Sequence, residues 1–460
     1  VCELAMSTRS PTLGYLGLSR NTRRSPPRQV ECPGRLFGDL AIVEEIEIPN
    51  ASYMLAIHEE LPNGSWRTRE EYEFPDPRGN GVLVPMKLVP WSLPGRPLEY
   101  ESERELFSEI REYLQHHLDL REEAAYDLLP CYTMMTWRIE EFDVIPYLNF
   151  LGPKGAGKTK SLEALASVCY RGWLITHPTP AAVFWITDHY CPTLLADNYE
   201  FWAKETRREL DGLFNAGYKR AATIPRRPRE TEHRASDLDI YKVFAPKIIS
   251  GTHEPSDALA TRCVRINMVK SSRELPLRIH QRWAQTLRSK LLQYRFRHFE
   301  SRTAKPHSVD VEVMNRYGRV GEIFYALMTI APDDETQTKI ASYAHTVYED
   351  QLEEDRASLE AEVVSAILAC RGQVVSDRLS IKAVTDELNA DRGEKDKIRP
   401  HKVGWITSRL GFEKGRMPDP PGSRAIILDP ALLQRLAAIY DSTGADTPLK
   451  LSECQIDRFE

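Results

Sequence analysis

The chain has 460 residues, which corresponds to about two to four domains of ordinary size. Hydrophobic residues make up 42% and charged residues 28%, so there is enough apolar material for globular cores. The formal net charge of −6 excludes a protein that coats nucleic acid with a uniformly basic surface. Any contact with DNA has to come from local basic patches.

The eight cysteines are scattered, and no Cys-x-x-Cys pair or histidine cluster accompanies them. This spacing argues against a zinc ribbon and against a dense disulfide framework. Reduced thiols in a cytoplasmic protein are the plain expectation. No apolar run approaches the length needed to cross a bilayer, so we expect no membrane contact.

Residues 1–29 combine arginines with Ser and Pro and lack an apolar core, which predicts a flexible tail rather than a signal peptide. Residues 30–100 have short β-like patterns and are predicted to form a β-rich module. Its expected strands are Ala41–Ile48 and Ala51–Ile57, with a turn at Asn63-Gly64.

Residues 101–145 change to a helical period, and two helices are expected there as a linker region. The apolar faces consist of Leu106, Ile110, Tyr113 and Leu114, then of Leu128, Leu129 and Tyr132.

Residues 146–270 alternate strand and helix signals, which predicts a parallel α/β sheet. The expected strands are Tyr147–Leu151, Trp173–Thr176, Thr193–Asp197, Lys247–Gly251 and Cys263–Met268. The expected helices are Lys158–Cys169 and Lys204–Ala216.

Residues 271–371 are predicted to be a helical, lid-like region, with helices throughout from residue 274. Residues 372–442 then contain a helix at Ile381–Leu388, a helix at Pro400–Leu410 and a hairpin within Phe412–Asp429. Helix, helix and hairpin in this order predict a winged-helix domain. The last residues, 443–460, are expected to be a tail.

A phosphate-binding motif follows the first strand of the α/β segment. Residues 152–159, Gly-Pro-Lys-Gly-Ala-Gly-Lys-Thr, match G-x-x-x-x-G-K-[ST] between a strand and an amphipathic helix. Lys158 is expected to reach the β- and γ-phosphates, and the Thr159 hydroxyl to ligate Mg²⁺. A glycine-rich turn without a ligand is the alternative. The predicted nucleotide-binding residues are Gly152, Pro153, Lys154, Gly155, Ala156, Gly157, Lys158, Thr159 and Lys160.

An acidic residue closes a later strand. Asp197 is predicted to hold Mg²⁺ through the ion's water shell, in the Walker B role, although an aspartate that caps a turn is the alternative. Asn198 stands where a glutamate usually orients the attacking water, and an amide orients water but cannot take its proton. Glu200 could swing in, or could be plain surface charge. Asn198 puts hydrolysis in more doubt than nucleotide binding.

Two further candidates follow in the chain. Thr252, with Ser250 as second choice, is predicted to sense the γ-phosphate and hold the water, and a simple strand-to-turn motif is the alternative. Arg262 precedes the last strand. It is predicted to stabilise charge on the phosphoryl oxygens of a neighbouring subunit's nucleotide, and the alternative is a structural arginine.

The ordered set of segments from Tyr147 to Met268 resembles the AAA+ and superfamily 3-like ATPase domains of mobile-element, plasmid and phage primase–helicases. Besides the P-loop, the resemblance rests on 143–152, 193–197, 214–220, 245–251 and 259–263. It implies ATP and Mg²⁺ as cofactors, a homo-oligomeric ring, possibly a hexamer, and single-stranded or forked DNA as partner. The first 100 residues show no acidic polymerase signature, so a primase would be a separate protein.

The predicted DNA contacts include basic residues between the strand that ends at Asp197 and the strand that precedes Thr252. The flanks 221–225 and 238–243 could pair as a hairpin, and a solvated loop is the alternative. In the resembling families, a hairpin at this place points into a central channel. The winged helix offers a second surface, which could equally bind protein. The predicted DNA-binding residues are Lys219, Arg220, Arg226, Arg227, Arg229 and Lys402.

The leading hypothesis is an ATP-driven DNA-binding motor, a replicative-type helicase of a mobile genetic element. A nucleotide-dependent assembly switch with little or no hydrolysis is the alternative, and Asn198 favours it. A small-molecule kinase on a P-loop scaffold is a third hypothesis. The long helical and winged-helix extensions argue against the kinase, because they add nothing to phosphate transfer onto a small acceptor.

Overall fold

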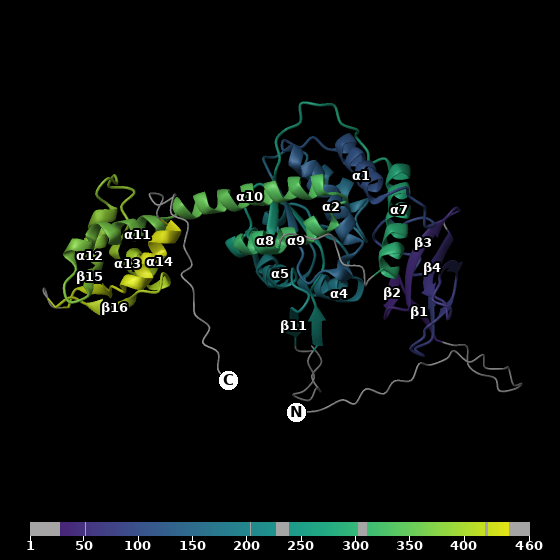
Figure 1. Ribbon diagram of the computed structural model, residues 1–460, viewed down its shortest axis with the longest axis horizontal. Coiled ribbons are helices and arrows are strands. Elements are labelled where there is room, and N and C mark those ends of the chain that lie inside the picture. The colour runs from purple at the N-terminus through teal and green to yellow at the C-terminus, as the bar shows by residue number, and fades with distance from the viewer. Residues whose placement is uncertain are drawn as a thin grey trace, which may run out of the picture. The chain divides into compact units, whose positions relative to one another are not determined.

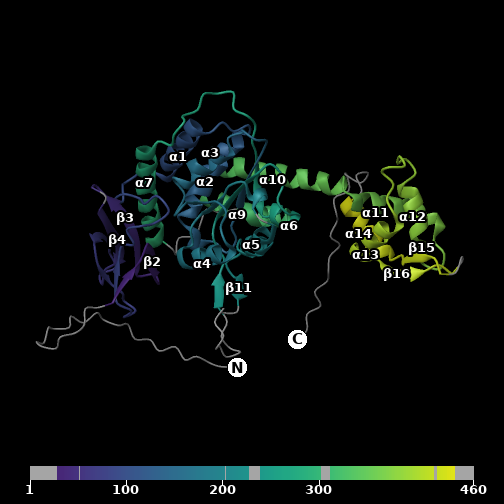
Figure 2. The same cartoon turned by 180° about the vertical axis from the view of Figure 1, so that it is seen from behind.

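The computed structural model describes residues 28–50, 52–202, 204–226, 239–301, 311–418 and 422–440. The chain divides into two compact units, Val1–Ser308 and Val309–Glu460 (Figures 1 and 2). Within the described ranges, no helix combines the length and apolar character needed to cross a membrane. The six cysteines in those ranges are free thiols.

An antiparallel sheet opens the first unit and contains both strands predicted there. Its order is β2-β3-β4-β5, and β3 and β4 have Val43, Leu55 and Ile57 fully buried in its core. β5 was not predicted, because four of its six residues are charged. A smaller sheet has the order β1-β7-β6. The strands are β1 (Gln29–Glu31), β2 (Gly34–Phe37), β3 (Ala41–Ile48), β4 (Ser52–Glu60), β5 (Trp66–Glu71), β6 (Phe74–Pro75) and β7 (Val82–Val84).

Three helices pack together in the first unit, the first of them in contact with the other two. They are α1 (Glu103–His117), α2 (Glu123–Thr136) and α7 (Gln281–Glu300). α7 lies beside the strands of the β module in both views (Figures 1 and 2). Helices were predicted from residue 274 onward, but α7 begins only at Gln281. Pro276 disfavours helix in the residues before it, and His280 caps the actual start.

A five-stranded parallel sheet forms the core, as predicted, with the order β14-β8-β13-β10-β9. β13 therefore lies between β8, which leads into the P-loop, and β10, which leads to Asp197. The strands are β8 (Tyr147–Leu151), β9 (Trp173–Ile175), β10 (Leu194–Ala196), β13 (Lys247–Gly251) and β14 (Cys263–Asn267). The helices are α3 (Lys158–Ala166), α4 (Pro180–Tyr190), α5 (Lys204–Ala216) and α6 (Asp257–Ala260).

α4 was not predicted, although its start carries a sequence signal. Thr179 accepts a hydrogen bond from the Ala182 amide, and Pro180 occupies the first helical turn. Both residues are favoured at these positions, so the cap could have been recognised.

The predicted hairpin is present between α5 and β13. β11 (Thr223–Arg226) pairs antiparallel with β12 (Asp239–Lys242), and both strands extend away from α4 and α5 (Figures 1 and 2). Residues 227–238 lie outside the described ranges, and with them Arg227 and Arg229.

The second unit begins with helices and ends in a small α/β module. The two predicted helices are α12 and α13, and the predicted hairpin is β16–β17, joined by an additional strand in the order β15-β17-β16. α11 contributes Val363, Val364 and Ile367 to the core of this module. The elements are α8 (Val311–Arg316), α9 (Arg319–Ile330), α10 (Asp334–Arg356), α11 (Leu359–Ala369), β15 (Arg378–Ser380), α12 (Ile381–Leu388), α13 (Pro400–Arg409), β16 (Glu413–Arg416), β17 (Arg424–Ile427) and α14 (Pro430–Tyr440).

A buried ion network joins the β module to the core and to α7. Glu44 of β3 accepts hydrogen bonds from Tyr170 (2.8 Å), Arg171 (3.1 Å) and Arg295 of α7 (3.0 Å). The Glu44 residue is 4% exposed. The neighbouring charges outweigh desolvation and raise the pKa of both guanidinium groups. The carboxylate therefore compensates two buried cations.

We expect Glu44→Ala to lower the free energy of unfolding of the first unit by about 3–5 kcal/mol, because it leaves the buried Arg171 guanidinium without its carboxylate and leaves Arg295 with Glu140 alone. Urea titration followed by tryptophan fluorescence measures the change. Glu70→Ala on β5 is the matched control. Its partner Arg96 is exposed, so the loss there should stay below about 1 kcal/mol. Equal losses in the two variants would contradict a special role for Glu44.

Candidate functional site

The loop after β8 has the backbone of a phosphate-binding loop. Gly155 and Gly157 adopt φ values of +82° and +87°, which glycine tolerates without a Cβ clash. A Cβ on Gly152 would stand 2.3 Å from the Met268 carbonyl oxygen. The loop curls back on itself at these glycines, and α3 begins directly after it at Lys158.

Lys158 lies inside this loop. Its ammonium donates to the carbonyl oxygens of Gly152 (2.6 Å) and Pro153 (3.0 Å), and the residue is only 6% exposed. Helix α3 directs its N-terminal backbone amides, with their partial positive charge, to the same place. The positive end of the helix and the ammonium together favour an anion at this loop.

Three oxygen-bearing side chains meet at the carboxyl end of β10. The Thr159 hydroxyl donates to Asp197 Oδ2 at 2.9 Å, and the Ser250 hydroxyl donates to Asp197 Oδ1 at 2.6 Å. The backbone N–H of Asn198 donates to Ser250 Oγ at 3.0 Å. The strand order explains this meeting, because β13 carries Ser250 between the strands that lead to Thr159 and Asp197.

The Thr159 and Asp197 oxygens fit a magnesium ion. Mg²⁺ prefers hard oxygen ligands such as hydroxyl and carboxylate oxygens. Thr159 and Asp197 supply one of each and are hydrogen-bonded to each other at 2.9 Å, so these two residues would hold the ion. Phosphate oxygens and water would complete such a shell.

A cavity of about 780 Å³, here called the P-loop cavity, opens beside these residues. A volume of this size accommodates a nucleotide-sized ligand. Thr176, His177 and Trp202 belong to its wall and were not predicted. Thr176 and His177 follow the carboxyl end of β9, where ligands of parallel sheets commonly bind, so topology could have identified them. The lining consists of Lys154, Gly155, Ala156, Gly157, Lys158, Thr159, Lys160, Thr176, His177, Asp197, Asn198, Trp202 and Thr252.

Asn198 has a conformational reason for its residue type. Its φ is +50° and its ψ +48°, the left-handed region in which Asn is among the most tolerated side chains. The chain turns there into a short 3-10 helix, Tyr199–Phe201. This turn carries Glu200 away from Asp197 and against the segment that follows β13.

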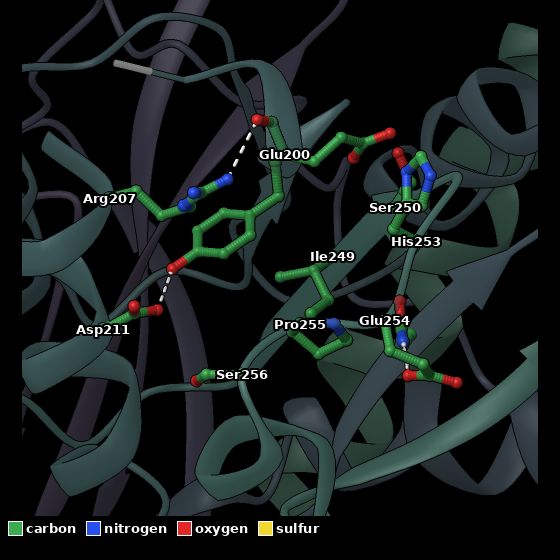
Figure 3. Close-up of a pocket in the computed structure, with 12 residues that line it drawn as sticks. Glu200, Arg207, Asp211, Ile249, Ser250, His253, Glu254, Pro255 and Ser256 are labelled. Carbon is green, nitrogen blue, oxygen red and sulfur yellow. Dashed lines mark hydrogen bonds between the residues drawn. The ribbon is translucent and has the colours of Figure 1, made fainter. Parts of the chain in front are cut away.

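Glu200 is bound to Thr252. Its Oε1 accepts from the Thr252 amide at 2.6 Å and from the Thr252 hydroxyl at 2.9 Å. Among the described residues, Asn198 and Thr252 line the P-loop cavity and Glu200 does not. Glu200 instead borders a second cavity of about 300 Å³, together with Arg207, Asp211, His253 and others (Figure 3).

Arg262 lies at the amino ends of the core strands, whereas the P-loop lies at their carboxyl ends. The next residue, Cys263, pairs with Tyr147 at the start of β8, whereas the P-loop follows the end of that strand. Five strand residues span roughly 16 Å. The Arg262 guanidinium donates to the carbonyls of Asn215 and Ala258 and lies over the Tyr218 ring. It is therefore remote from the P-loop of its own chain.

The predicted DNA-binding residues fall into different surroundings. Arg220 donates to the carbonyl oxygens of Ile139 and Phe142 and lies over the Phe244 ring. Its guanidinium therefore connects segments of its own chain. Arg226 on β11 is half-buried and pairs with Glu209 at 3.2 Å. Lys402 is exposed on α13.

Comparison with known proteins leaves the family open. No family model matches the chain, and no curated protein matches it. Among solved structures, the chain is similar to the C-terminal region of NrS-1, with 12% identity, a TM-score of 0.35 and coverage of 84% of this chain and 96% of that one. The active helicase Cch of SCCmec type IV has 12% identity, a TM-score of 0.37, and coverage of 87% and 94%. Drosophila ORC bound to DNA has 13% identity, a TM-score of 0.21, and coverage of 76% and 96%. All three TM-scores lie below 0.5, so function has to be inferred from the geometry.

We expect Ser250→Ala to weaken Mg²⁺-dependent nucleotide binding by roughly 10- to 100-fold, because the Asp197 carboxylate loses the donor that orients it. Binding measured in EDTA should change little. Isothermal titration calorimetry with and without Mg²⁺ separates the two. Ser108→Ala on α1, where the hydroxyl donates to a helix carbonyl at an exposed position, is the control. Unchanged Mg²⁺ dependence in Ser250→Ala would show that Asp197 acts without this contact.

Proposed function

We propose that the protein is an ATP-dependent DNA-binding motor of the helicase type. The observation that carries the proposal is the contact of Thr159 with Asp197 beside Lys158, at the rim of a nucleotide-sized cavity. A phosphate-binding loop, a buried ammonium and a matching pair of metal-binding oxygens are the parts that triphosphate binding requires.

The P-loop residues have separate parts in this proposal. The backbone of residues 152–157 and the start of α3 hold the phosphates, and Lys158 contacts the β- and γ-phosphates. Thr159 and Asp197 hold Mg²⁺, which neutralises charge on the phosphate oxygens when bound. Adenine as the base rests on the resemblance to AAA+ ATPases.

A homo-oligomer, in which each nucleotide lies between two copies, is part of the same proposal. Arg262 is remote from the P-loop of its own chain and precedes β14 at the amino ends of the core strands. At this position Arg262 could stabilise only the transferring phosphate of a neighbouring copy. In this arrangement it would have to release the carbonyls of Asn215 and Ala258 to reach the next subunit's nucleotide, and a closed ring provides one such contact for each copy.

Two surfaces are proposed to bind DNA. The first is the hairpin β11–β12 with the segment before it: Arg226 lies on β11, Lys219 precedes the strand, and Arg227 and Arg229 lie outside the described residues. The second is the α12–α13 module with the β16–β17 hairpin, proposed as a winged helix with Lys402 on its exposed helix. Arg220 is left out, since backbone carbonyls already occupy its donors.

The second candidate function is a nucleotide-dependent assembly switch. Asn198 carries no base, and Glu200 borders a different cavity from the P-loop. Both observations favour slow hydrolysis. A switch would bind ATP and recruit partners through its N-terminal and C-terminal modules without turning over.

We expect ATP turnover that single-stranded DNA stimulates and that Lys158→Ala lowers by at least about 100-fold, because the variant removes the ammonium from the β- and γ-phosphates. Steady-state phosphate release with and without an oligonucleotide measures both effects. Lys339→Ala, an exposed lysine on α10, is the control. ATP binding without turnover would establish the switch instead, and turnover that needs a small acceptor would establish a kinase.

We expect the double variant Arg226→Ala with Arg227→Ala to bind DNA more weakly and to lower the slope of log K against log salt by about 1.4, the value for two phosphates of a single strand. Fluorescence anisotropy across a salt series measures it, and nucleotide affinity should stay unchanged. Arg67→Ala with Arg96→Ala, two exposed arginines of the β module, is the control. An unchanged slope would remove the hairpin from the DNA surface.

A further inference from the structure

Glu200 and Thr252 form a hydrogen-bonded pair between two cavities. Thr252 belongs to the lining of the P-loop cavity, and Glu200 to the lining of the second cavity. The hydroxyl–carboxylate distance is 2.9 Å, and the Thr252 amide holds the same carboxylate oxygen at 2.6 Å. In Figure 3, Glu200 lies beside Ser250 and His253, at the end of the cavity near the segment that follows β13.

Asp197 and Asn198 are poorly suited to take a proton from water, and the remaining candidate base in the wall of the P-loop cavity is His177. Both oxygens of Asp197 are engaged, one with Thr159 and one with Ser250. The Asn198 side chain ends in an amide, which is not basic at neutral pH. A carboxylate base for the P-loop cavity has to act through a residue of its wall. Thr252 is hydrogen-bonded to such a carboxylate, and His253 Nδ1 lies 2.9 Å from the same hydroxyl.

We propose that Glu200 accepts the proton of the attacking water through the Thr252 hydroxyl. This inference rests on the proposed ATPase activity and assigns the base for it. As water attacks the γ-phosphorus, one of its O–H bonds breaks and its proton binds Thr252 Oγ1. The original Thr252 proton passes at the same time to Glu200 Oε1. The new P–O bond forms, the bond from the γ-phosphorus to the β–γ bridging oxygen breaks, and ADP leaves with that electron pair. Thr252 touches the reacting water, and Glu200 is the positioning and proton-accepting group behind it.

The second cavity provides an exit for the proton. Its volume of about 300 Å³ has room for several water molecules, and exposed His253 belongs to its wall. Glu200 Oε2 is buried and has no hydrogen-bond partner among the described residues. After hydrolysis Glu200 returns its proton to water on this side, away from the phosphate. The Thr252 hydroxyl then donates to Glu200 again.

The geometry also explains why a glycine, Gly251, directly precedes Thr252. A Cβ on Gly251 would stand 2.7 Å from Glu200 Oε2 and 3.1 Å from the His253 carbonyl oxygen. A side chain there would displace the carboxylate from Thr252. The close approach of Glu200 to β13 therefore depends on glycine at this position.

The test compares Glu200→Gln, Thr252→Val, Thr252→Ser and the Glu200→Gln/Thr252→Val double variant in the full-length protein with DNA. Single-turnover hydrolysis and the Kd for Mg·ATP are measured for each. We expect Glu200→Gln and Thr252→Val each to lower the hydrolysis rate by roughly 10²- to 10⁴-fold, the usual contribution of a general base, with Kd within about threefold of the wild type. Thr252→Ser keeps the hydroxyl and should restore most of the rate.

The double variant should be no slower than the slower single variant, since both substitutions interrupt one relay. Glu200→Gln keeps an oxygen acceptor for the Thr252 amide. A purely structural role would therefore leave its rate near that of the wild type, and this outcome would overturn the proposal. An inactive Glu200→Gln beside a fully active Thr252→Val would also overturn it, because Glu200 would then act without Thr252. Parallel loss of nucleotide affinity and rate would indicate a local structural role alone.

The relay and the proposed function fail in different ways. If wild-type protein binds Mg·ATP but does not hydrolyse it with DNA, the ATPase proposal fails and the relay with it. If the wild type hydrolyses ATP and Lys158→Ala does not, while Thr252→Val keeps the wild-type rate, the relay alone is excluded.

Discussion

The contact of Thr159 and Ser250 with the two oxygens of Asp197 is the constraint on which the site depends. These residues are far apart in the chain and come from the first turn of α3, the end of β13 and the turn after β10. They meet because β13 lies between β8 and β10 in a parallel sheet, where all three strands end at the same edge. A different strand order would leave the P-loop without its acidic partner, even with every motif residue present.

The turn at Asn198 determines where Glu200 lies. A left-handed residue directly after Asp197 starts the 3-10 helix that presents Glu200 to Thr252. One backbone conformation thus places an amide side chain directly after Asp197 and a carboxylate beside Thr252. Asn suits this position, since the left-handed region favours Asn over Glu.

β13 also connects the P-loop cavity to the hairpin. Its first residue, Lys247, is fully buried and donates to the carbonyls of Val243 and Ala245 and to the Tyr147 hydroxyl. Burial lowers the pKa of Lys247 to about 7. Val243, the residue after β12, is thereby hydrogen-bonded to the first residue of β13, and Ser250 lies near the other end of β13. Any shift of that strand reaches both the cavity and the hairpin.

The sequence by itself determined the P-loop and the five core strands, because these depend on local periodicity and on residue types with narrow conformational roles. Gly157 at a left-handed position and the apolar run of β13 are such signals. It left the hairpin open against a solvated loop, and the pairing of β11 with β12 decided between them. The tertiary structure decided which distant side chains touch. It turned Glu200 toward Thr252, committed Arg220 to backbone carbonyls and brought His177 to the P-loop cavity. These outcomes depend on strand order and on backbone turns, which side-chain spacing along the chain does not encode.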